Sequence, residues 1–301
     1  MTVIVIIGLL VTLLMSAVQG ARETARRTQC LHTMREVGQA AILYESHENG
    51  YPGWNHPVIG PPPALQRYPN GWIFQLLPSL GRGDLSDPTV TVALNELLVC
   101  PSDSEKMALR APNSPTSVVG NAGRVDARAT ATTPADWRAN AGLVNRDDRD
   151  ANGAPVKVDP TDASYIARGD GLAYTLLLTE NLDAGTWYNF TADETLSGVV
   201  FWPPDAAGNF PPKLVHTING PKLNVTTPYD TARPSSNHRG GVNMFFCDGH
   251  GRFVGQGIDY GVYCALMTPR GRNAAEPGTN PPTPSASQIT SPPPLTEDSL
   301  R

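Results

Sequence analysis

The sequence predicts an α+β protein in which one long N-terminal helix packs on an antiparallel β-sheet with long loop and strand insertions. Two observations predict it: an unbroken helical pattern over about the first 48 residues, and strand-like runs with an Asp-Gly hairpin signal in the second half. The chain has 301 residues and a formal net charge of -5. That balance lacks the basic surface of a nucleic-acid-binding protein, so we expect no nucleic-acid partner.

Residues 1–21 are expected to form the transmembrane half of the helix. No charged side chain occurs between Thr2 and Ala21. About 20 helical residues span roughly 30 Å, the thickness of the hydrocarbon core of a bilayer. A cleavable signal peptide normally has basic residues before a shorter apolar core, and nothing basic precedes the run here. We therefore expect a retained membrane anchor.

Residues 22–48 are expected to form the amphipathic half of the same helix. Apolar side chains recur there at spacings of three or four, which places them on one face: Leu31, Met34, Val37, Ala41 and Tyr44. Glu23 and Arg27 are four apart, a favourable spacing for an ion pair. A stop signal follows at residues 49–53, Asn-Gly-Tyr-Pro-Gly. The result is one helix of about 45 residues, or roughly 68 Å.

Residues 49–272 are expected to form a β-rich domain. The run WIFQLLPSL at residues 72–80 predicts a short apolar helix or strand, and residues 104–165 predict long loops with short strands. AYTLLLTE, at 173–180, and GVVFWPPD, at 198–205, are candidates for buried strands. Residues 273–301 are rich in Pro, Ser and Thr, a composition typical of a disordered tail.

Several blocks occur in an order that carries a family resemblance. After the apolar run come LLVCPSD, TSVVGNAG and GDGLAYTLLLTENLDAGTW, and finally His238, which nine residues separate from Asp248-Gly249. Together they resemble bacterial type IV pilin-like, or pseudopilin-like, proteins. These carry a prepilin-type N-terminal segment and a C-terminal H-x(9)-D-G motif. The resemblance covers roughly residues 3–256.

The resemblance implies a pilin-like fold and a role in assembly rather than catalysis. It implies a single-pass inner-membrane protein with its globular domain exported to the periplasm or cell surface. Its expected partners are other pilin-like subunits and the platform of a type II secretion or type IV pilus-like system. The sequence departs from the family pattern in three places. The leader, processing site and following glutamate are absent, Ser16 replaces a common proline, and Ala173-Tyr174 replaces Ser-Asn. Cleavage by prepilin peptidase is therefore not predicted.

One loop has the ligand spacing of a calcium site. Asp148, Asp150 and Asn152 fall at positions 1, 3 and 5 of a calcium loop, with Gly153 at position 6 and Asp159 at position 12. No helical pattern flanks the loop, so an EF-hand is not predicted. Ca²⁺ is the one candidate cofactor, and the alternative is a solvated Asp/Asn turn.

The four cysteines are Cys30, Cys100, Cys247 and Cys264. They allow three pairings into two disulfides, and an exported domain would permit such bonds. The sequence does not select a pairing, and free, buried cysteines are an equal alternative. No C-x-x-C pair is present, which argues against a structural zinc site.

The stretch NHRGGVNMFFCDGHGRFVG, residues 237–255, has two interpretations. Cys247 with His238 or His250 resembles a nucleophile and its base, which suggests a hydrolase. Alternatively, Asp248-Gly249 is a two-residue hairpin turn. We favour the hairpin, in which His238, Asp248 and Gly249 have structural roles.

The hairpin interpretation makes specific predictions about register. Cys247 should face His250, and Met244 should face Phe253. One apolar face should then hold four side chains: Val242, Met244, Phe246 and Phe253.

The main alternative to an assembling subunit is an exported, membrane-anchored module that binds Ca²⁺, a glycan or a peptide and does not polymerise. The aromatic cluster of Trp187, Tyr188 and Phe190 would suit such a ligand surface, although strand packing is a commoner reason for it. Glu180 is expected to be buried and hydrogen-bonded rather than catalytic. No phosphate loop, dinucleotide fingerprint or H-E-x-x-H motif occurs, so the protein is not expected to be an enzyme.

Overall fold

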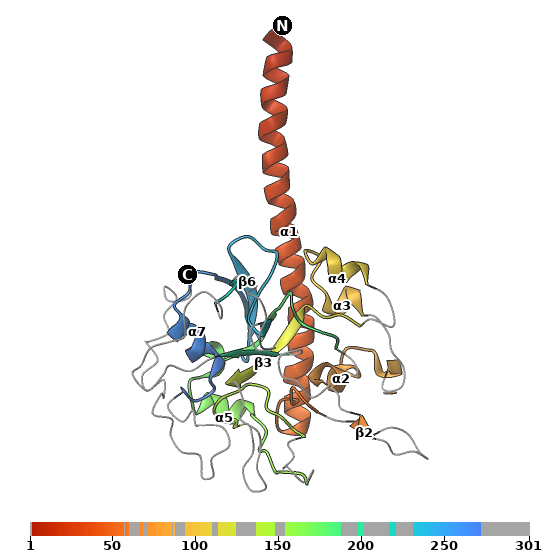
Figure 1. Ribbon diagram of the computed structural model, residues 1–301, viewed down its shortest axis with the longest axis vertical. Coiled ribbons are helices and arrows are strands. Elements are labelled where there is room, and N and C mark those ends of the chain that lie inside the picture. Colours follow the sequence, from red (N-terminus) through yellow and green to blue (C-terminus); the bar gives the residue numbers. More distant parts are fainter. Residues whose placement is uncertain are drawn as a thin grey trace.

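In the computed structural model, the N-terminal half of helix α1 stands out from a globular part that encloses the other half (Figure 1). The structure describes residues 2–56, 58–59, 67–68, 71–85, 87, 94–109, 114–124, 137–147, 154–187, 198–201, 217–220 and 231–271. The first residues of the predicted calcium loop, 148–153, and the predicted tail, 273–301, lie outside these ranges.

Helix α1 is continuous over Thr2–Glu48, as the sequence predicts. In the described part of the chain, one helix, Ile6–Glu48, is long and apolar enough to cross a membrane. Its first half exposes ten large apolar side chains, each 41% to 73% accessible: Val3, Ile4, Ile6, Ile7, Leu10, Val11, Leu13, Leu14, Met15 and Val18. In the second half Met34, Val37 and Ala41 are fully buried, which confirms the predicted apolar face. The helix ends before Asn49, whose φ of 54° is left-handed.

The sheet has five strands in the order β5-β3-β4-β6-β7. Their bounds are β3 Val118–Arg124, β4 Leu176–Glu180, β5 Gly198–Phe201, β6 Gly241–Phe246 and β7 Gly251–Gly255. The sheet is mixed rather than antiparallel as predicted, because β5 pairs in parallel with β3. After β4 the chain passes β3 and adds β5 at the sheet edge, on the far side of β3. β4 runs antiparallel to β3, whereas β5 runs in the same direction as β3. The runs at 176–180 and 198–201 do form the predicted buried strands.

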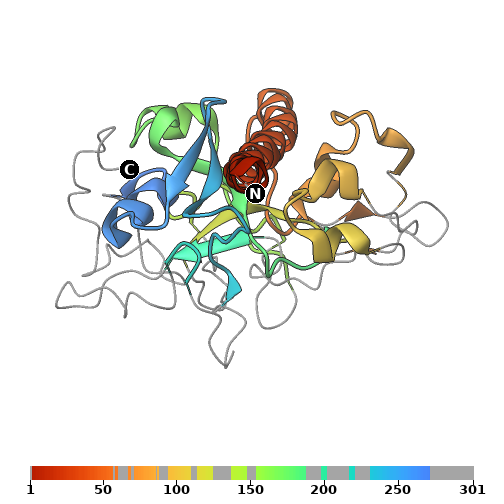
Figure 2. The same cartoon turned by 90° about the horizontal axis from the view of Figure 1, so that it is seen from above.

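Side chains from the two faces of the sheet belong to two separate buried clusters. On one face the second half of α1 packs against β4 and β6, with Met34, Val37, Leu178 and Phe245 in the same cluster. On the other face α7, Tyr260–Met267, which the sequence analysis did not predict, covers Val242, Met244, Phe246 and Val254. Figure 2 shows the β6–β7 hairpin between α1 and α7. Helix α1 is therefore a core element of the domain as well as its projecting rod.

Short elements complete the described part of the chain. The run at residues 72–80 was predicted to be a short helix or a strand, and it begins with a short helix, α2. Residues 104–165 hold more structure than predicted, because β3 in their midst is a fully buried strand of seven residues. The bounds of the remaining elements are α2 Trp72–Leu76, α3 Asn95–Leu98, α4 Ser104–Ala108, α5 Ala163–Ala167, η1 Gly83–Leu85, η2 Leu172–Tyr174, and the paired strands β1 Val58–Ile59 and β2 Arg67–Tyr68.

Candidate functional site

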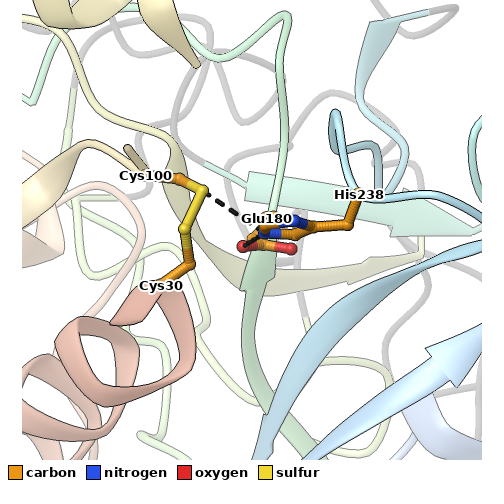
Figure 3. Close-up of side chains that lie close together, drawn as sticks. All are labelled: Cys30, Cys100, Glu180 and His238. Carbon is orange, nitrogen blue, oxygen red and sulfur yellow. Dashed lines mark hydrogen bonds and ion pairs between the residues drawn. A yellow bond between two sulfur atoms is a disulfide. The ribbon is translucent and has the colours of Figure 1, made fainter. Parts of the chain in front are cut away.

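A buried polar cluster lies where α1 enters the globular part. It brings together five side chains from four separate segments of the chain, and we call it the junction site: Glu23 and Cys30 on α1, Cys100 after α3, Glu180 at the end of β4, and His238 before β6. Figure 3 shows Cys30, Cys100, Glu180 and His238 pointing toward one another. The site combines a disulfide, a histidine and two carboxylates.

The disulfide joins Cys30 to Cys100. Their Cα atoms lie 4.9 Å apart across a sequence separation of 70, and both side chains are buried. Cys247 and Cys264 are buried and form no disulfide. Of the four cysteines, two therefore form one disulfide, which attaches α1 to the segment after α3. The other two pack in the core.

His238 lies at the centre of the site, with its side chain 1% exposed. Its Nδ1 is 2.6 Å from Oε1 of Glu23. Its Nε2 is 3.3 Å from Oε1 of Glu180 and 3.4 Å from Sγ of Cys100. Burial lowers the pKa of His238, but the carboxylates of Glu180 and Glu23 outweigh it, and the net effect raises the pKa above its ordinary value.

Glu180 is fixed by Asn243 on the neighbouring strand. The backbone N–H of Asn243 donates to Oε2 of Glu180 over 2.9 Å, and its side-chain Nδ2 donates to Oε1 over 3.1 Å. The same Nδ2 reaches the carbonyl oxygen of Arg27 at 3.3 Å. Glu180 is thus buried and hydrogen-bonded, as predicted, and Asn243 connects it to α1.

Local turns place Cys100 and His238 beside each other. The backbone N–H of Asp103 donates to the carbonyl of Cys100 over 2.8 Å, which closes the CPSD turn. The Asp103 carboxylate then accepts from the backbone N–H of Lys106 at the start of α4. Asn237 donates from Nδ2 to the carbonyl of Ser102 over 2.8 Å, so the segment that carries His238 is tied to this turn.

The two ends of the H-x(9)-D-G stretch lie in different places in the fold. His238 belongs to the junction site, whereas Asp248 lies at the hairpin tip, where Oδ1 accepts from the backbone N–H of His250 and is 2.6 Å from its Nδ1. Gly249 has a φ of 92°, a left-handed conformation that favours glycine. The motif therefore places His238 before the start of β6 and Asp248 after its end.

The predicted hairpin register is wrong by one residue. Phe246 donates to the carbonyl of His250, and Met244 pairs with Arg252 rather than with Phe253. The turn thus has three residues, 247–249, because the left-handed glycine at its third position adds a bulge that a two-residue turn lacks. Phe253 consequently pairs with Asn243 and lies under the Arg27 guanidinium, 4.4 Å from the ring centre. Arg27 makes this contact in place of the expected pair with Glu23, whose described partners are Arg26 and His238.

Cys247 has the environment of a core thiol. Burial raises its pKa well above the ordinary value, which disfavours the thiolate that a nucleophile requires. His250, its proposed base, is paired with Asp248. His238, the other proposed base, is engaged by Glu23 and Glu180.

The other candidate ligand residues lie elsewhere. Asp148, Asp150 and Asn152 fall outside the described residues, and Asp159 is 3.5 Å from Nζ of Lys157 at the surface. Trp187 is buried at 1% exposure, in keeping with a packing role, and Tyr188 and Phe190 are not among the described residues.

A polar cleft of about 700 Å³ adjoins the junction site. Its lining includes Ser102 and Asn237, the close sequence neighbours of Cys100 and His238. Arg233, whose Nη1 is 3.4 Å from Oδ2 of Asp183, forms another part of the wall.

Sequence reasoning did not identify Glu23 or Asn243 as site residues. Two local signals were available. Glu23 is the first acidic residue after the charge-free run, and Asn243 is a polar residue within the apolar strand GVNMFF. A buried polar residue in such a strand needs a hydrogen-bond partner, which predicts a contact without naming it.

The junction site should make stability depend on pH. Because the folded-state pKa of His238 is raised, its stabilising contribution is complete below the ordinary pKa of 6.5 and is lost as pH rises through the folded value. As pH rises through this window, the melting temperature of the oxidised wild-type protein should fall. The part of this fall that is due to His238 should be absent from His238→Gln. Thermal unfolding of the full chain, followed by circular dichroism at a series of pH values, measures it.

Glu23→Gln provides the matched variant for this pH experiment, because it removes one of the two carboxylates and keeps the side-chain shape. It should shrink the pH-dependent component and shift it toward lower pH. Identical pH profiles for wild type and His238→Gln would contradict the prediction.

Comparison with known proteins identifies the family of the chain. A family model described as a protein of unknown function (DUF1559), SBP_bac_10, matches residues 19–261 and so spans every residue of the junction site. No curated protein and no solved structure matches the chain. The match covers more than half of the 301 residues, and the chain therefore belongs to the SBP_bac_10 (DUF1559) family.

Proposed function

We propose that this protein is a membrane-anchored, pseudopilin-like subunit of a type II secretion or type IV pilus-like system that acts through assembly of its N-terminal helices rather than through catalysis. Its globular domain is exported, and the first half of α1 lies in the inner membrane. Other pilin-like subunits and the assembly platform are its partners.

The observation that carries this proposal is the exposed apolar half of α1. Ten large apolar side chains surround the helix there, and the region between Thr2 and Ala21 has no charged side chain. Exposed apolar area costs about 25 cal/mol per Å² in water, so such a surface favours lipid or other helices. Arg22, Arg26 and Arg27 follow directly and mark the end of the apolar run.

Two further features support an exported, assembling protein. The Cys30–Cys100 disulfide suits an oxidising compartment outside the cytoplasm. The continuity of α1 over Thr2–Glu48 supports a rigid connection between membrane and domain, without a flexible linker. A rod fixed to its domain can pack beside identical rods and set the spacing of the domains.

The anchor is tested by charge substitution in the full chain. Arginine at the centre of a membrane helix costs about 2.5–3.5 kcal/mol per residue. We expect Leu10→Arg/Leu14→Arg to move the protein from the carbonate-resistant membrane fraction to the soluble fraction. Leu43→Arg is the matched control, because Leu43 is 47% exposed on the same helix but beyond the apolar half. Membrane retention of the double variant would overturn the anchor.

Assembly is tested by oxidative cross-linking of single cysteines in the membrane half. In membranes, Leu13→Cys, Leu14→Cys and Met15→Cys chains should yield dimers from at least one position, because three successive side chains point about 100° apart around a helix of 3.6 residues per turn. A cysteine at Leu43 should give far less dimer.

The second candidate function is a membrane-anchored module that binds Ca²⁺, a glycan or a peptide and does not polymerise. The polar cleft beside the junction site favours it. The cross-linking experiment separates the two functions. Failure of all three membrane positions to cross-link, with the anchor intact, would favour the binding module.

A further inference from the structure

We propose that reduction of the Cys30–Cys100 disulfide converts the junction site into a buried binding site for a thiophilic divalent cation, with Zn²⁺ as the typical ion. The ligands are the two sulfur atoms, Nε2 of His238 and a carboxylate oxygen of Glu180. These four side chains are buried, and their ligand atoms all lie within 4.8 Å of one another.

The spacing of the ligand atoms matches a tetrahedral zinc centre. Bonds of about 2.0 Å to nitrogen and oxygen and about 2.3 Å to sulfur place N and S about 3.5 Å apart, and N and O about 3.3 Å apart. The corresponding distances from Nε2 of His238 are 3.4 Å to Sγ of Cys100 and 3.3 Å to Oε1 of Glu180. Two sulfur ligands of one zinc ion lie about 3.8 Å apart, so the bond between them has to be broken first.

The residues around these ligands already have the arrangement that metal sites use. A metal-binding histidine almost always donates its other ring N–H to a carboxylate or carbonyl, which fixes the tautomer. Glu23 supplies that carboxylate, with Oε1 at 2.6 Å from Nδ1 of His238, and so directs Nε2 toward the cluster. Asn243 holds the Glu180 carboxylate by two hydrogen bonds from the neighbouring strand.

The redox step is a thiol–disulfide exchange with a dithiol reductant. One thiolate of the reductant attacks a sulfur of the disulfide and forms a mixed disulfide, and its second thiol then displaces the remaining cysteine. Two electrons pass to the protein, the reductant becomes a disulfide, and Cys30 and Cys100 are released as thiols. Zn²⁺ binding displaces their two protons, because thiolates are the metal ligands.

This site has a structural meaning for α1. In the oxidised form a covalent bond attaches Cys30 on α1 to Cys100, and in the reduced form the metal connects the same two residues together with β4. In the reverse exchange, the disulfide form of the same reductant takes back the two electrons, the Cys30–Cys100 bond re-forms, and the loss of two ligands releases the ion. The junction site therefore couples metal binding to redox state, independently of whether the chain polymerises. The missing C-x-x-C pair does not oppose this, since the fold supplies the proximity.

The test measures Co²⁺ and Zn²⁺ binding by the full chain in detergent. A Cys247→Ala/Cys264→Ala background removes the other thiols. The protein is compared oxidised and after reduction with dithiothreitol and anaerobic removal of the reductant. We expect one metal ion per reduced chain and none per oxidised chain. The Co²⁺ form should show tetrahedral ligand-field bands and a thiolate-to-metal charge-transfer band.

Variants assign the ligands. His238→Ala, Cys30→Ala and Cys100→Ala should each lose the tetrahedral Co²⁺ spectrum. Glu23→Gln should retain the spectrum but weaken affinity by about 10- to 100-fold, as expected for a residue that orients a ligand. Circular dichroism checks that each variant is folded. The proposal would be overturned if the reduced, unsubstituted site showed no tetrahedral Co²⁺ bands, whatever the variants do. It would also be overturned if these bands survived the His238→Ala substitution.

Discussion

Replacing both Cys30 and Cys100 with alanine is expected to lower the free energy of unfolding by about 4 kcal/mol. A disulfide restricts the unfolded chain, and the restriction grows with the length of the loop that it closes. The bond here spans a sequence separation of 70, for which loop-closure entropy gives roughly 4 kcal/mol. Both side chains are buried, and alanine removes only their sulfur atoms, so the added cavities are small.

Urea unfolding of the full chain in detergent with EDTA measures the effect without interference from metal. Dithiothreitol should destabilise the wild type by a similar amount and leave the double variant unchanged. Cys247→Ala is the matched control, because it removes a buried thiol that forms no disulfide. It should cost much less, about 1 kcal/mol. A double variant as stable as the wild type would contradict the prediction.

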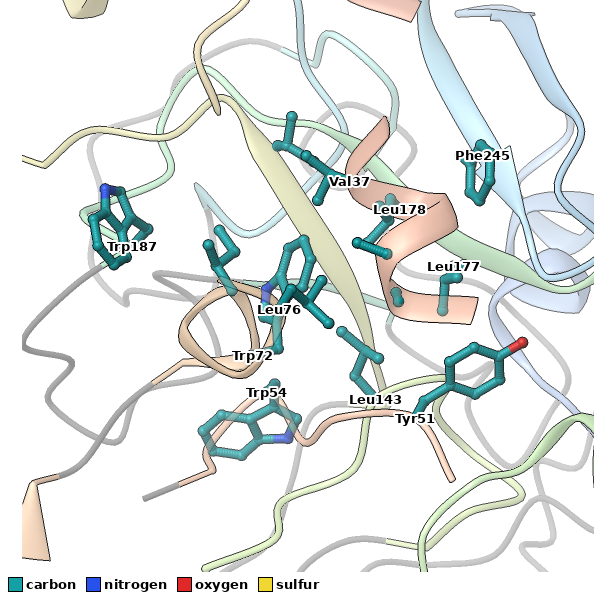
Figure 4. Packing of buried hydrophobic residues seen from close by; sticks show 14 of the residues in the cluster. Val37, Tyr51, Trp54, Trp72, Leu76, Leu143, Leu177, Leu178, Trp187 and Phe245 are labelled. Carbon is teal, nitrogen blue, oxygen red and sulfur yellow. The ribbon is translucent and has the colours of Figure 1, made fainter. Parts of the chain in front are cut away.

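Gly38→Val is expected to destabilise the protein by about 3 kcal/mol through overpacking between α1 and the sheet. A Cβ atom at Gly38 would overlap the ring of Phe245 on β6, and that ring is fully buried. Figure 4 shows Phe245 beside the stretch of α1 that carries Val37. Only a residue without a side chain allows helix and strand to approach this closely. The loss should exceed any gain in helix propensity, which is below about 1 kcal/mol.

Gly20→Val is the control for this substitution, because Gly20 lies on the same helix with no atom within 4 Å of its added Cβ. It should change the unfolding free energy by no more than about 0.5 kcal/mol. Urea unfolding of both variants in the same detergent provides the measurement. Equal effects at the two glycines would show that helix propensity, rather than close packing, determines the result.

Local patterns predicted those parts of the fold that repeat with the helix or strand period. The spacing of Met34, Val37 and Ala41 located the buried face of α1, and alternation placed Val242, Met244 and Phe246 on one face of β6. The prediction failed where one residue changes the geometry. The third residue of the hairpin turn shifted the register of β7, and the position of β5 depended on a crossover that no local pattern encodes.

The junction site depends on contacts between distant segments, and for that reason the sequence did not predict it. Glu23 and His238 are separated by 215 residues, and Cys30 and Cys100 by 70. In the sequence, Glu23 is one charge on a helix, His238 is one residue of a motif, and Cys30 and Cys100 are two of four cysteines. Only the packing of α1 against β4 and β6 brings them into one place.

The position of the disulfide along α1 also has a mechanical consequence. Cys30 precedes the end of the helix at Glu48 by 18 residues, or about 27 Å of rod. A tensile load applied to the projecting end would reach the covalent bond before it reached Met34, Val37 and Ala41. The bond would carry that load into the segment at Cys100, and the buried helix face beyond it would be shielded from shear.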